Sequence, residues 1–360
     1  MKQIIFIFNE GRTARLNEEP NGPKEFFYSY QEFKKNKQNV DLVESNLKNR
    51  SIFKPLFRLT RKITKLPIYT ENFISLKSIK KIFDSETIFA TNQNLGFSIL
   101  PILYLKKIFK KSNFYVFAMG LLENNSEKQG KFLFNSFIDN TTKIFFISKS
   151  ELIEAKKIFP QYKDKFIYIP FSIDTEYWKS ASENIKKEYI LFIGNDMNRD
   201  YEFVSKLSEK MQNQKFILIS EKISKPHLSN VEVINGNWNK LLLSDDEIKE
   251  YYKKSLMTIL PLKQTFQPSG QSVALQSIST GTPVLITSTK GFWDNENFKD
   301  NENILFINEN KIEIWEEKIN NLLTDSQLYS RIIENGKSLI EQEYNLNLMY
   351  SRILDATTKS

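Results

Sequence analysis

Residues Gln267 to Pro283 read QPSGQSVALQSISTGTP, and an apolar run flanks them on either side. The two runs, Met257–Leu260 and Val284–Thr287, are typical of buried strands, and the apolar spacing over Ser272–Thr280 predicts a helix between them. Gly281 suits the left-handed residue that ends a helix, and the proline two residues later prevents continuation. The segment therefore predicts a strand–loop–helix–strand unit of a parallel α/β sheet.

The turn before this helix can be interpreted in two ways. Gly270 has no side chain, so the backbone can come close to a ligand, and the free amides of a helix start favour an anion such as a diphosphate. The same residues also fit an ordinary turn of a doubly wound domain, since one glycine-containing turn is weak evidence. From the residues alone, both interpretations stay open.

Short apolar strands alternate with amphipathic helices along the whole chain, which predicts parallel sheets covered by helices on both faces. Because 360 residues exceed what one core of roughly 250–300 residues holds, we expect two domains, 1–175 and 188–340, and a carboxyl-terminal helix at 341–360 that can cross back to the first domain. The predicted strands are Gln3–Phe8, Val40–Val43, Thr87–Ala90, Phe114–Ala118, Lys143–Ser148, Phe166–Pro170, Tyr189–Ile193, Phe216–Ser220, Val231–Ile234, Met257–Leu260 and Val284–Thr287. The predicted helices are Glu25–Lys35, Phe97–Lys110, Lys131–Phe137, Glu151–Phe159, Tyr201–Met211, Asp245–Lys254 and Ser272–Thr280.

The composition excludes several kinds of chemistry. The chain has no cysteine and one histidine, His227, so disulfides, thiolate metal sites, cysteine nucleophiles and histidine clusters are excluded. We interpret His227 as a surface histidine. No apolar run approaches the ~20 residues that cross a bilayer, and the apolar run after Met1 is too short for a signal peptide. A cytoplasmic location is therefore expected.

The segment quoted first resembles the donor-site motif of retaining GT-B glycosyltransferases, family 4 or group 1. In that family a Glu, seven residues and a second Glu precede a run of small residues and Gly-x-Pro-Val. Here Gln276 holds the place of the second Glu and Pro268 that of the first, which resembles a glycolipid-synthase-like subset. The resemblance implies an α/β fold of two Rossmann-like, doubly wound domains that face a central cleft.

The resemblance also implies the residues that bind a nucleotide-sugar donor. Gln276 would hydrogen-bond the ribose, and Trp238 would flank the base, although a core tryptophan fits as well. Arg199, in the loop after the strand Tyr189–Ile193, would bind the diphosphate, with a solvated surface arginine as the alternative. The catalytic residues would be Arg199 and Gln271. The donor-binding residues would be Gly22, Gly194, Asn195, Arg199, Trp238, Ser269, Gly270, Gln271, Ser272 and Gln276.

The reaction that the resemblance implies needs neither a metal nor a cofactor besides the nucleotide-sugar co-substrate. Many relatives carry a histidine after the fifth strand, where this chain has Ala118-Met-Gly120. In the front-side retaining mechanism the leaving phosphate accepts the proton of the acceptor. The protein then supplies positioning and charge stabilisation.

One basic stretch accounts for most of the net charge of +8. Ten Lys and Arg residues lie between Asp41 and Lys81, against three acids. Within the stretch, a predicted helix has apolar residues on one face and cations on the other, a pattern typical of helices that lie on anionic membranes. A helix packed on its own domain with a solvated basic face is the alternative. The membrane-surface cations would be Lys54, Arg58, Arg61, Lys62 and Lys65.

The resemblance, together with the basic helix, implies a retaining glycosyltransferase that transfers a hexose from a nucleotide-sugar, a UDP-sugar foremost, to a membrane lipid such as diacylglycerol. The protein would lie on the inner face of the cytoplasmic membrane. A glycosyltransferase of lipopolysaccharide or exopolysaccharide synthesis and a non-catalytic nucleotide-sugar-binding protein are the alternatives. We expect no nucleic-acid partner, because the basic stretch lacks the interleaved aromatic residues of a stacking platform.

Overall fold

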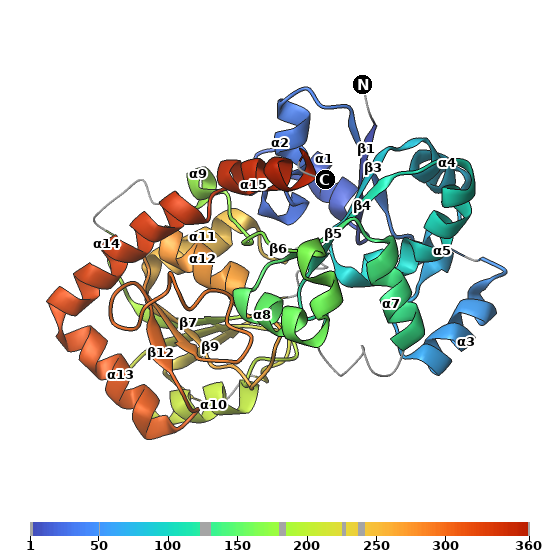
Figure 1. Ribbon diagram of the computed structural model, residues 1–360. Helices are drawn as coiled ribbons and strands as arrows, with labels where there is room; N and C mark the ends of the chain where they lie inside the picture. Colours follow the sequence, from blue (N-terminus) through green and yellow to red (C-terminus); the bar gives the residue numbers. More distant parts are fainter. Residues whose placement is uncertain are drawn as a thin grey trace. The chain divides into compact units, whose positions relative to one another are not determined.

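The computed structural model describes residues 3–49, 51–122, 131–179, 185–224, 228–236 and 242–358 (Figure 1). The chain forms two compact units. Unit 1 consists of Met1–Asn21, Phe26–Pro170 and Tyr350–Ser360, and unit 2 consists of Gly22–Glu25 and Phe171–Met349. This division differs from a cut near residue 175 in two places, because Gly22–Glu25 is part of unit 2 and Tyr350–Ser360 is part of unit 1.

Unit 1 is built on a parallel sheet of six strands in the order β2-β1-β3-β4-β5-β6. The central strands are apolar along almost their whole length and are buried, as expected when helices cover both faces. All six predicted strands of this half are therefore confirmed. Their bounds are β1 (Ile4–Phe8), β2 (Val40–Glu44), β3 (Thr87–Ala90), β4 (Asn113–Ala118), β5 (Lys143–Phe146) and β6 (Phe166–Tyr168).

The helices of unit 1 differ from the prediction near the amino terminus. The predicted helix Glu25–Lys35 is interrupted at Tyr28 and Ser29, whose φ angles of 49° and 66° no α-helix accommodates. The segment between β1 and Glu25, for which no helix was predicted, contains α1. The bounds are α1 (Arg12–Glu18), η1 (Glu25–Phe27), α2 (Tyr30–Lys35), α3 (Lys54–Thr64), η2 (Thr70–Phe73), α4 (Leu76–Asp84), α5 (Gln93–Phe109), α7 (Lys131–Asn140), α8 (Lys149–Ile158) and η4 (Pro160–Lys165).

Unit 2 is built on a second parallel sheet of six strands, in the order β12-β11-β10-β7-β8-β9. Five of these strands were predicted. From β7 the chain continues to β8 and β9 on one side, and then returns to β10 and adds strands on the other side. The order therefore reverses between β7 and β10. The bounds are β7 (Tyr189–Ile193), β8 (Phe216–Ile219), β9 (Val231–Ile234), β10 (Ser255–Leu260), β11 (Val284–Thr287) and β12 (Leu305–Ile307).

Helices cover both faces of this second sheet (Figure 1). The contacts pair α11 with α12 and α10 with α13, and α14 packs on α12. Ser244 begins α11 with the capping box that its sequence predicts. The bounds are α9 (Thr175–Trp178), α10 (Tyr201–Lys210), α11 (Asp245–Lys254), α12 (Gln271–Ser279), α13 (Ile312–Thr324), α14 (Ser326–Glu343) and α15 (Leu346–Thr358), the last of which continues from unit 2 into unit 1.

Candidate functional site

Two loops meet at the point where the strand order of the second sheet reverses. One loop, Gly194 to Asp200, follows β7, and the other, Pro261 to Gly270, follows β10. The Asp200 amide donates to the Pro261 carbonyl at 2.9 Å, and the Lys263 amide donates to the Asn198 carbonyl at 2.8 Å. Because open α/β sheets bind ligands at the carboxyl ends of the strands beside such a switch point, these loops are the candidate site of unit 2.

The loop after β10 ends in a helix start that can bind an anion. Gly270 is the residue before α12 and has φ of 80°, a left-handed conformation that favours glycine. No side chain caps this end of α12 within the described part of the chain. The helix dipole favours negative charge at this end of α12, so an anionic ligand can bind there.

Arg199 is buried beside this helix start, with 2% of its surface exposed. A Cβ on Gly194 would lie 2.6 Å from Nε of Arg199, and a Cβ on Gly270 would lie 2.8 Å from its Nη1. The guanidinium thus occupies a slot that exists only because both neighbours are glycines. The alternative of a solvated surface arginine is wrong.

The charge of Arg199 is only partly balanced. Its Nε lies 2.9 Å from an oxygen of Asp196, but the N–H is not aligned as a hydrogen bond to that oxygen. Among the described residues, Nη1 has no hydrogen-bond acceptor. A buried cation with an unused donor next to a helix amino terminus favours the binding of an anion, because such a donor is costly to leave unpaired.

The remaining loop residues mainly hold the two loops in place. The side-chain amide of Asn195 donates to the Gly236 carbonyl at 2.5 Å, and its oxygen accepts from Ser220 and the Glu221 amide. Asn198, which sequence reasoning missed, donates to the Ser269 hydroxyl at 2.7 Å. Asn195 and Ser269 therefore support the loops through their side chains. Trp238 lies outside the described residues.

The structure gives Gln276 a role other than the predicted contact with a ribose. Its Nε2 donates to Oε1 of Glu25 at 2.9 Å, and its Oε1 accepts from the Tyr252 hydroxyl at 3.2 Å. Gln276 is buried, so both ends of its amide serve an internal network. Gln276 is held in this network by the buried carboxyl group of Glu25, a residue of the first half of the sequence that was predicted to begin a helix.

Glu25 is fully buried, and its carboxyl group accepts hydrogen bonds from three other residues. The donors are Nε2 of Gln276, Nε1 of Trp178 at 2.8 Å and the Asp174 amide at 3.3 Å. Burial raises the pKa of Glu25 to about 7, although the hydrogen bonds act in the opposite direction. Its neighbour Gly22, a predicted donor residue, is part of unit 2 as well.

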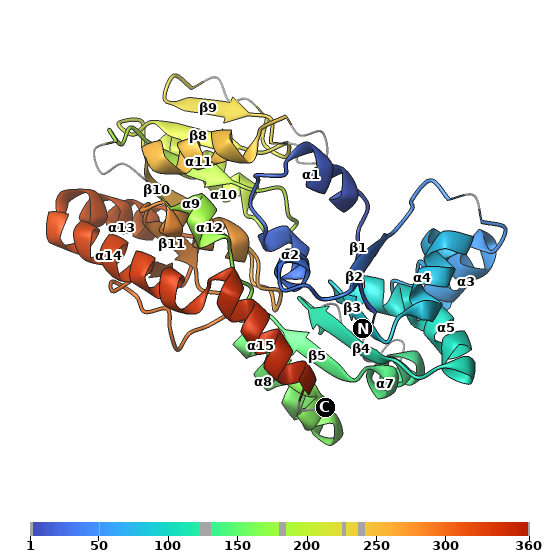
Figure 2. The same cartoon turned by 90° about the horizontal axis from the view of Figure 1, so that it is seen from above.

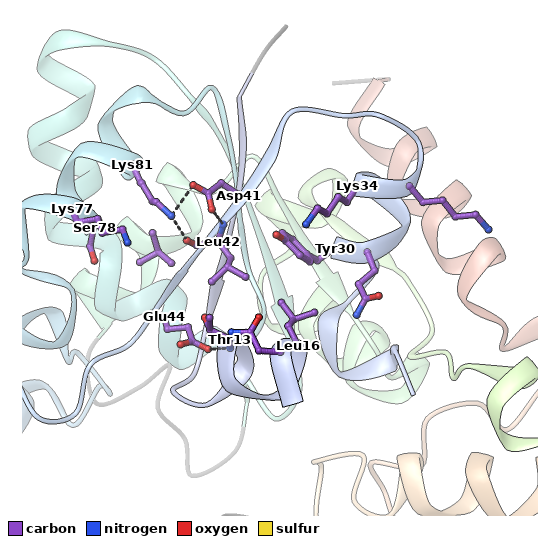
Figure 3. Close-up of a pocket in the computed structure, with 14 residues that line it drawn as sticks. Thr13, Leu16, Tyr30, Lys34, Asp41, Leu42, Glu44, Lys77, Ser78 and Lys81 are labelled. Atoms are coloured by element: carbon purple, nitrogen blue, oxygen red, sulfur yellow. Dashed lines mark hydrogen bonds and ion pairs between the residues drawn. The ribbon is translucent and has the colours of Figure 1, made fainter. Parts of the chain in front are cut away.

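Unit 1 contains a separate pocket of about 760 Å³ along its edge strand β2 (Figure 3). Lys81 pairs with Asp41 at 2.7 Å and donates to the Leu42 carbonyl at 3.2 Å, while Glu44 accepts from the Thr13 amide. None of the lining residues belongs to the predicted donor or membrane site. This pocket is therefore distinct from the candidate site of unit 2.

The described residues contain no group of three or more His, Cys, Asp or Glu side chains placed to hold a metal ion. Independence from metals and cofactors stays a prediction. Likewise, none of the helices in the described ranges is long and apolar enough to cross a membrane.

Comparisons with known proteins agree with this architecture. The sequence profile of the family described as glycosyl transferases group 1 matches residues 232–339, whereas no curated protein matches the sequence. Sucrose-phosphate synthase from Thermosynechococcus elongatus has a similar structure, with a TM-score of 0.71 at 11% identity over 100% of this chain and 99% of that one. HepE from Anabaena, in complex with UDP and glucose, gives a TM-score of 0.69 at 12% identity over 100% of both chains. An alpha-glucosyltransferase in complex with UDP-glucose and DNA containing an abasic site gives 0.64 at 15% identity over 99% of both chains.

Two doubly wound units with this strand order have the fold of the GT-B glycosyltransferases. The profile of glycosyl transferases group 1 matches the part of the second unit that contains the loop after β10 and the helix α12. The predicted fold and class of enzyme are therefore confirmed.

Proposed function

We propose that the protein is a retaining glycosyltransferase that transfers a hexose from a UDP-sugar to a lipid acceptor at an anionic membrane surface. The observation that carries the donor half is the buried guanidinium of Arg199 with its unused Nη1 donor beside the uncapped start of α12. The structures of HepE with UDP and of the alpha-glucosyltransferase with UDP-glucose support a UDP-sugar as the donor.

In the proposed reaction, the oxygen of an acceptor hydroxyl forms a bond to the anomeric carbon while the bond from that carbon to the diphosphate breaks. The hydroxyl proton passes to the diphosphate oxygen that leaves from the same face, which retains the anomeric configuration. Negative charge develops on the leaving diphosphate. Arg199 and the amides of Gln271 and Ser272 would stabilise this charge, and Gly22 and Gly194 would allow the close approach of backbone to the phosphates.

The membrane half rests on α3, which lies at the outer edge of unit 1 in both views (Figures 1 and 2). No residue of α3 is buried. Its apolar residues are exposed as well, Ile52 just before the helix by 85% and Ile63 within it by 69%. The helix is therefore only partly packed on its own domain, through Phe57, and leaves the rest of its apolar face uncovered. An uncovered apolar face next to exposed cations fits the interface of an anionic bilayer.

One of the five predicted membrane cations has a different role. Nη1 of Arg61 donates to Glu71 at 2.8 Å and to the Ile68 carbonyl at 2.7 Å, and its guanidinium lies over the ring of Tyr69. Glu71 is buried, so its charge holds Arg61 against the domain. The exposed cations that remain for a membrane are Lys54, Arg58, Lys62 and Lys65.

A screen of nucleotide-sugars with lipid acceptors tests the proposal, with released nucleotide and glycolipid followed by mass spectrometry. We expect a UDP-hexose with diacylglycerol in vesicles to give a glycolipid. Release of nucleotide without glycolipid would reject the lipid acceptor. Binding of a UDP-sugar without any turnover would favour the non-catalytic alternative.

Replacing Arg58 and Lys62 of α3 together with glutamine is expected to weaken binding to phosphatidylglycerol vesicles by about 30-fold. Each cation near such a surface contributes ~1 kcal/mol, so two contribute ~2 kcal/mol. Cosedimentation with vesicles at increasing salt measures the effect, which should shrink as salt screens the charges. Lys163→Gln with Lys210→Gln, two exposed lysines on other elements, is the matched control. Equal binding of both double variants would remove the membrane part of the proposal.

A further inference from the structure

A four-residue segment of the first half of the sequence is built into the second unit. Gly22–Glu25 is part of unit 2, although Asn21 and Phe26 on its two sides are part of unit 1. Within unit 2, Glu25 is fully buried, and Nζ of Lys24 lies 3.9 Å from Asp174. A charged residue is rarely buried unless its hydrogen bonds are satisfied, so the contacts of Glu25 reveal its role.

The carboxyl group of Glu25 joins three segments that are far apart in the sequence. It accepts from the Asp174 amide at the start of α9, from Trp178 in α9 and from Gln276 in α12. Gln276 accepts in turn from Tyr252 of α11, whose ring meets that of Trp178 edge-on at 5.9 Å. All of these atoms lie within unit 2 and are buried.

The helix that Glu25 holds is the one whose start forms the candidate donor site. Gln276 lies five residues after Gln271, which corresponds to about 7.5 Å along the axis of α12. An α-helix is rigid over this length, so the position of Gln276 determines where the first amides of α12 point. Those amides, with Nη1 of Arg199, form the anion site described above.

We propose that Glu25 is a positioning residue of the donor site, which fixes α12 through Gln276 and holds Gly22 and Lys24 on the unit that binds the donor. This inference rests on the proposed function for the identity of the donor. Lys24, with 43% of its side chain exposed, can pair with the negative charge of the donor from the solvent side.

The chemistry of the three donors explains why a carboxyl group is needed at this position. Alanine would leave the Trp178 indole, the Gln276 amide and the Asp174 amide as buried donors without an acceptor, which destabilises this arrangement. Glutamine would keep one oxygen for two of the donors, but it would turn an N–H₂ group toward the Asp174 amide.

Hydrogen–deuterium exchange together with donor binding tests this role. In Glu25→Ala we expect faster exchange over residues 171–179 and 271–280 and an increase of about tenfold in the Kd for UDP-glucose measured by calorimetry. Glu25→Gln should show an increase of about threefold, a partial rescue. Glu71→Gln is the matched control, because Glu71 is also buried but lies in unit 1, paired with Arg61. It should leave both measurements unchanged even if the midpoint of thermal unfolding falls.

The outcomes separate the two proposals. Wild-type exchange rates over both segments in a folded Glu25→Ala would overturn the positioning role, and so would faster exchange with an unchanged Kd. If the wild-type protein binds neither UDP-glucose nor UDP, the proposed donor is rejected, and the exchange measurement alone decides whether Glu25 holds α12. If Glu25→Ala does not fold, Trp178→Phe removes a single donor, and we expect it to raise the Kd for UDP-glucose by about threefold.

Discussion

Arg199→Ala is expected to lower kcat/KM for sugar transfer by about 100-fold or more, the usual effect of removing one preorganised donor from a developing oxyanion. The guanidinium is held between Gly194 and Gly270 before any ligand arrives, so it needs no rearrangement when charge develops on the leaving diphosphate. Its Nη1 is buried and has no acceptor among the described residues, so an anion bound beside it would satisfy this donor. Initial rates at varied UDP-sugar concentration measure the loss.

Two further variants make this result specific. Arg199→Lys keeps the positive charge but loses the planar, forked donor, so an intermediate rate is expected. Met197→Ala changes an exposed residue of the same loop and should retain wild-type activity. Thermal unfolding checks that each variant folds. A folded Arg199→Ala enzyme with activity within threefold of the wild type would contradict the assignment of Arg199 to the diphosphate.

Much of the architecture could be predicted because buried parallel strands carry a local signal. Strands such as β1 and β7 are short, uninterrupted apolar runs, and their order along the chain predicts a doubly wound sheet. The strand β12 was not predicted, since three residues give too little periodicity. The break at Tyr28 and Ser29 was missed because neither residue type favours a positive φ.

The candidate site could be predicted only in part, for reasons that the individual residues show. The turn at Gly270 and the loop containing Arg199 follow adjacent strands, so a switch point brings them together. The burial of Arg199 depends on two glycines from different loops, which no local pattern reveals. The partner of Gln276 lies 251 positions away in the sequence, at Glu25. Similarly, the period of α3 predicts an amphipathic helix, but only the fold shows that Arg61 faces Glu71.

The burial of Glu25 also predicts how the stability of unit 2 depends on pH. Its pKa rises from 4.5 to about 7 on folding, so between these values the folded state keeps a proton that the unfolded state has lost. Stability therefore falls as pH rises through this window, by roughly 2 to 3 kcal/mol between pH 5 and pH 8, and Glu25 adds no further change above it. The ionisable groups around Glu25 are Tyr252 and Asp174, which pairs with Lys24. Burial raises the pKa of Tyr252, and the charge of Arg199 acts in the opposite direction.

In Glu25→Gln this loss with rising pH should be absent. The quantity to compare is the free energy of unfolding of the variant minus that of the wild type. This difference is expected to increase by roughly 2 to 3 kcal/mol from pH 5 to pH 8. Any other effect of the substitution adds a constant that does not depend on pH. The tryptophans within the described residues, Trp178, Trp293 and Trp315, lie in unit 2, so urea unfolding followed by tryptophan fluorescence reports on this unit. Glu209→Gln, at an exposed position of α10, is the matched control and should give a difference that stays constant with pH. A constant difference for Glu25→Gln as well would mean that Glu25 does not carry a raised pKa, and that its carboxyl group is charged throughout this range.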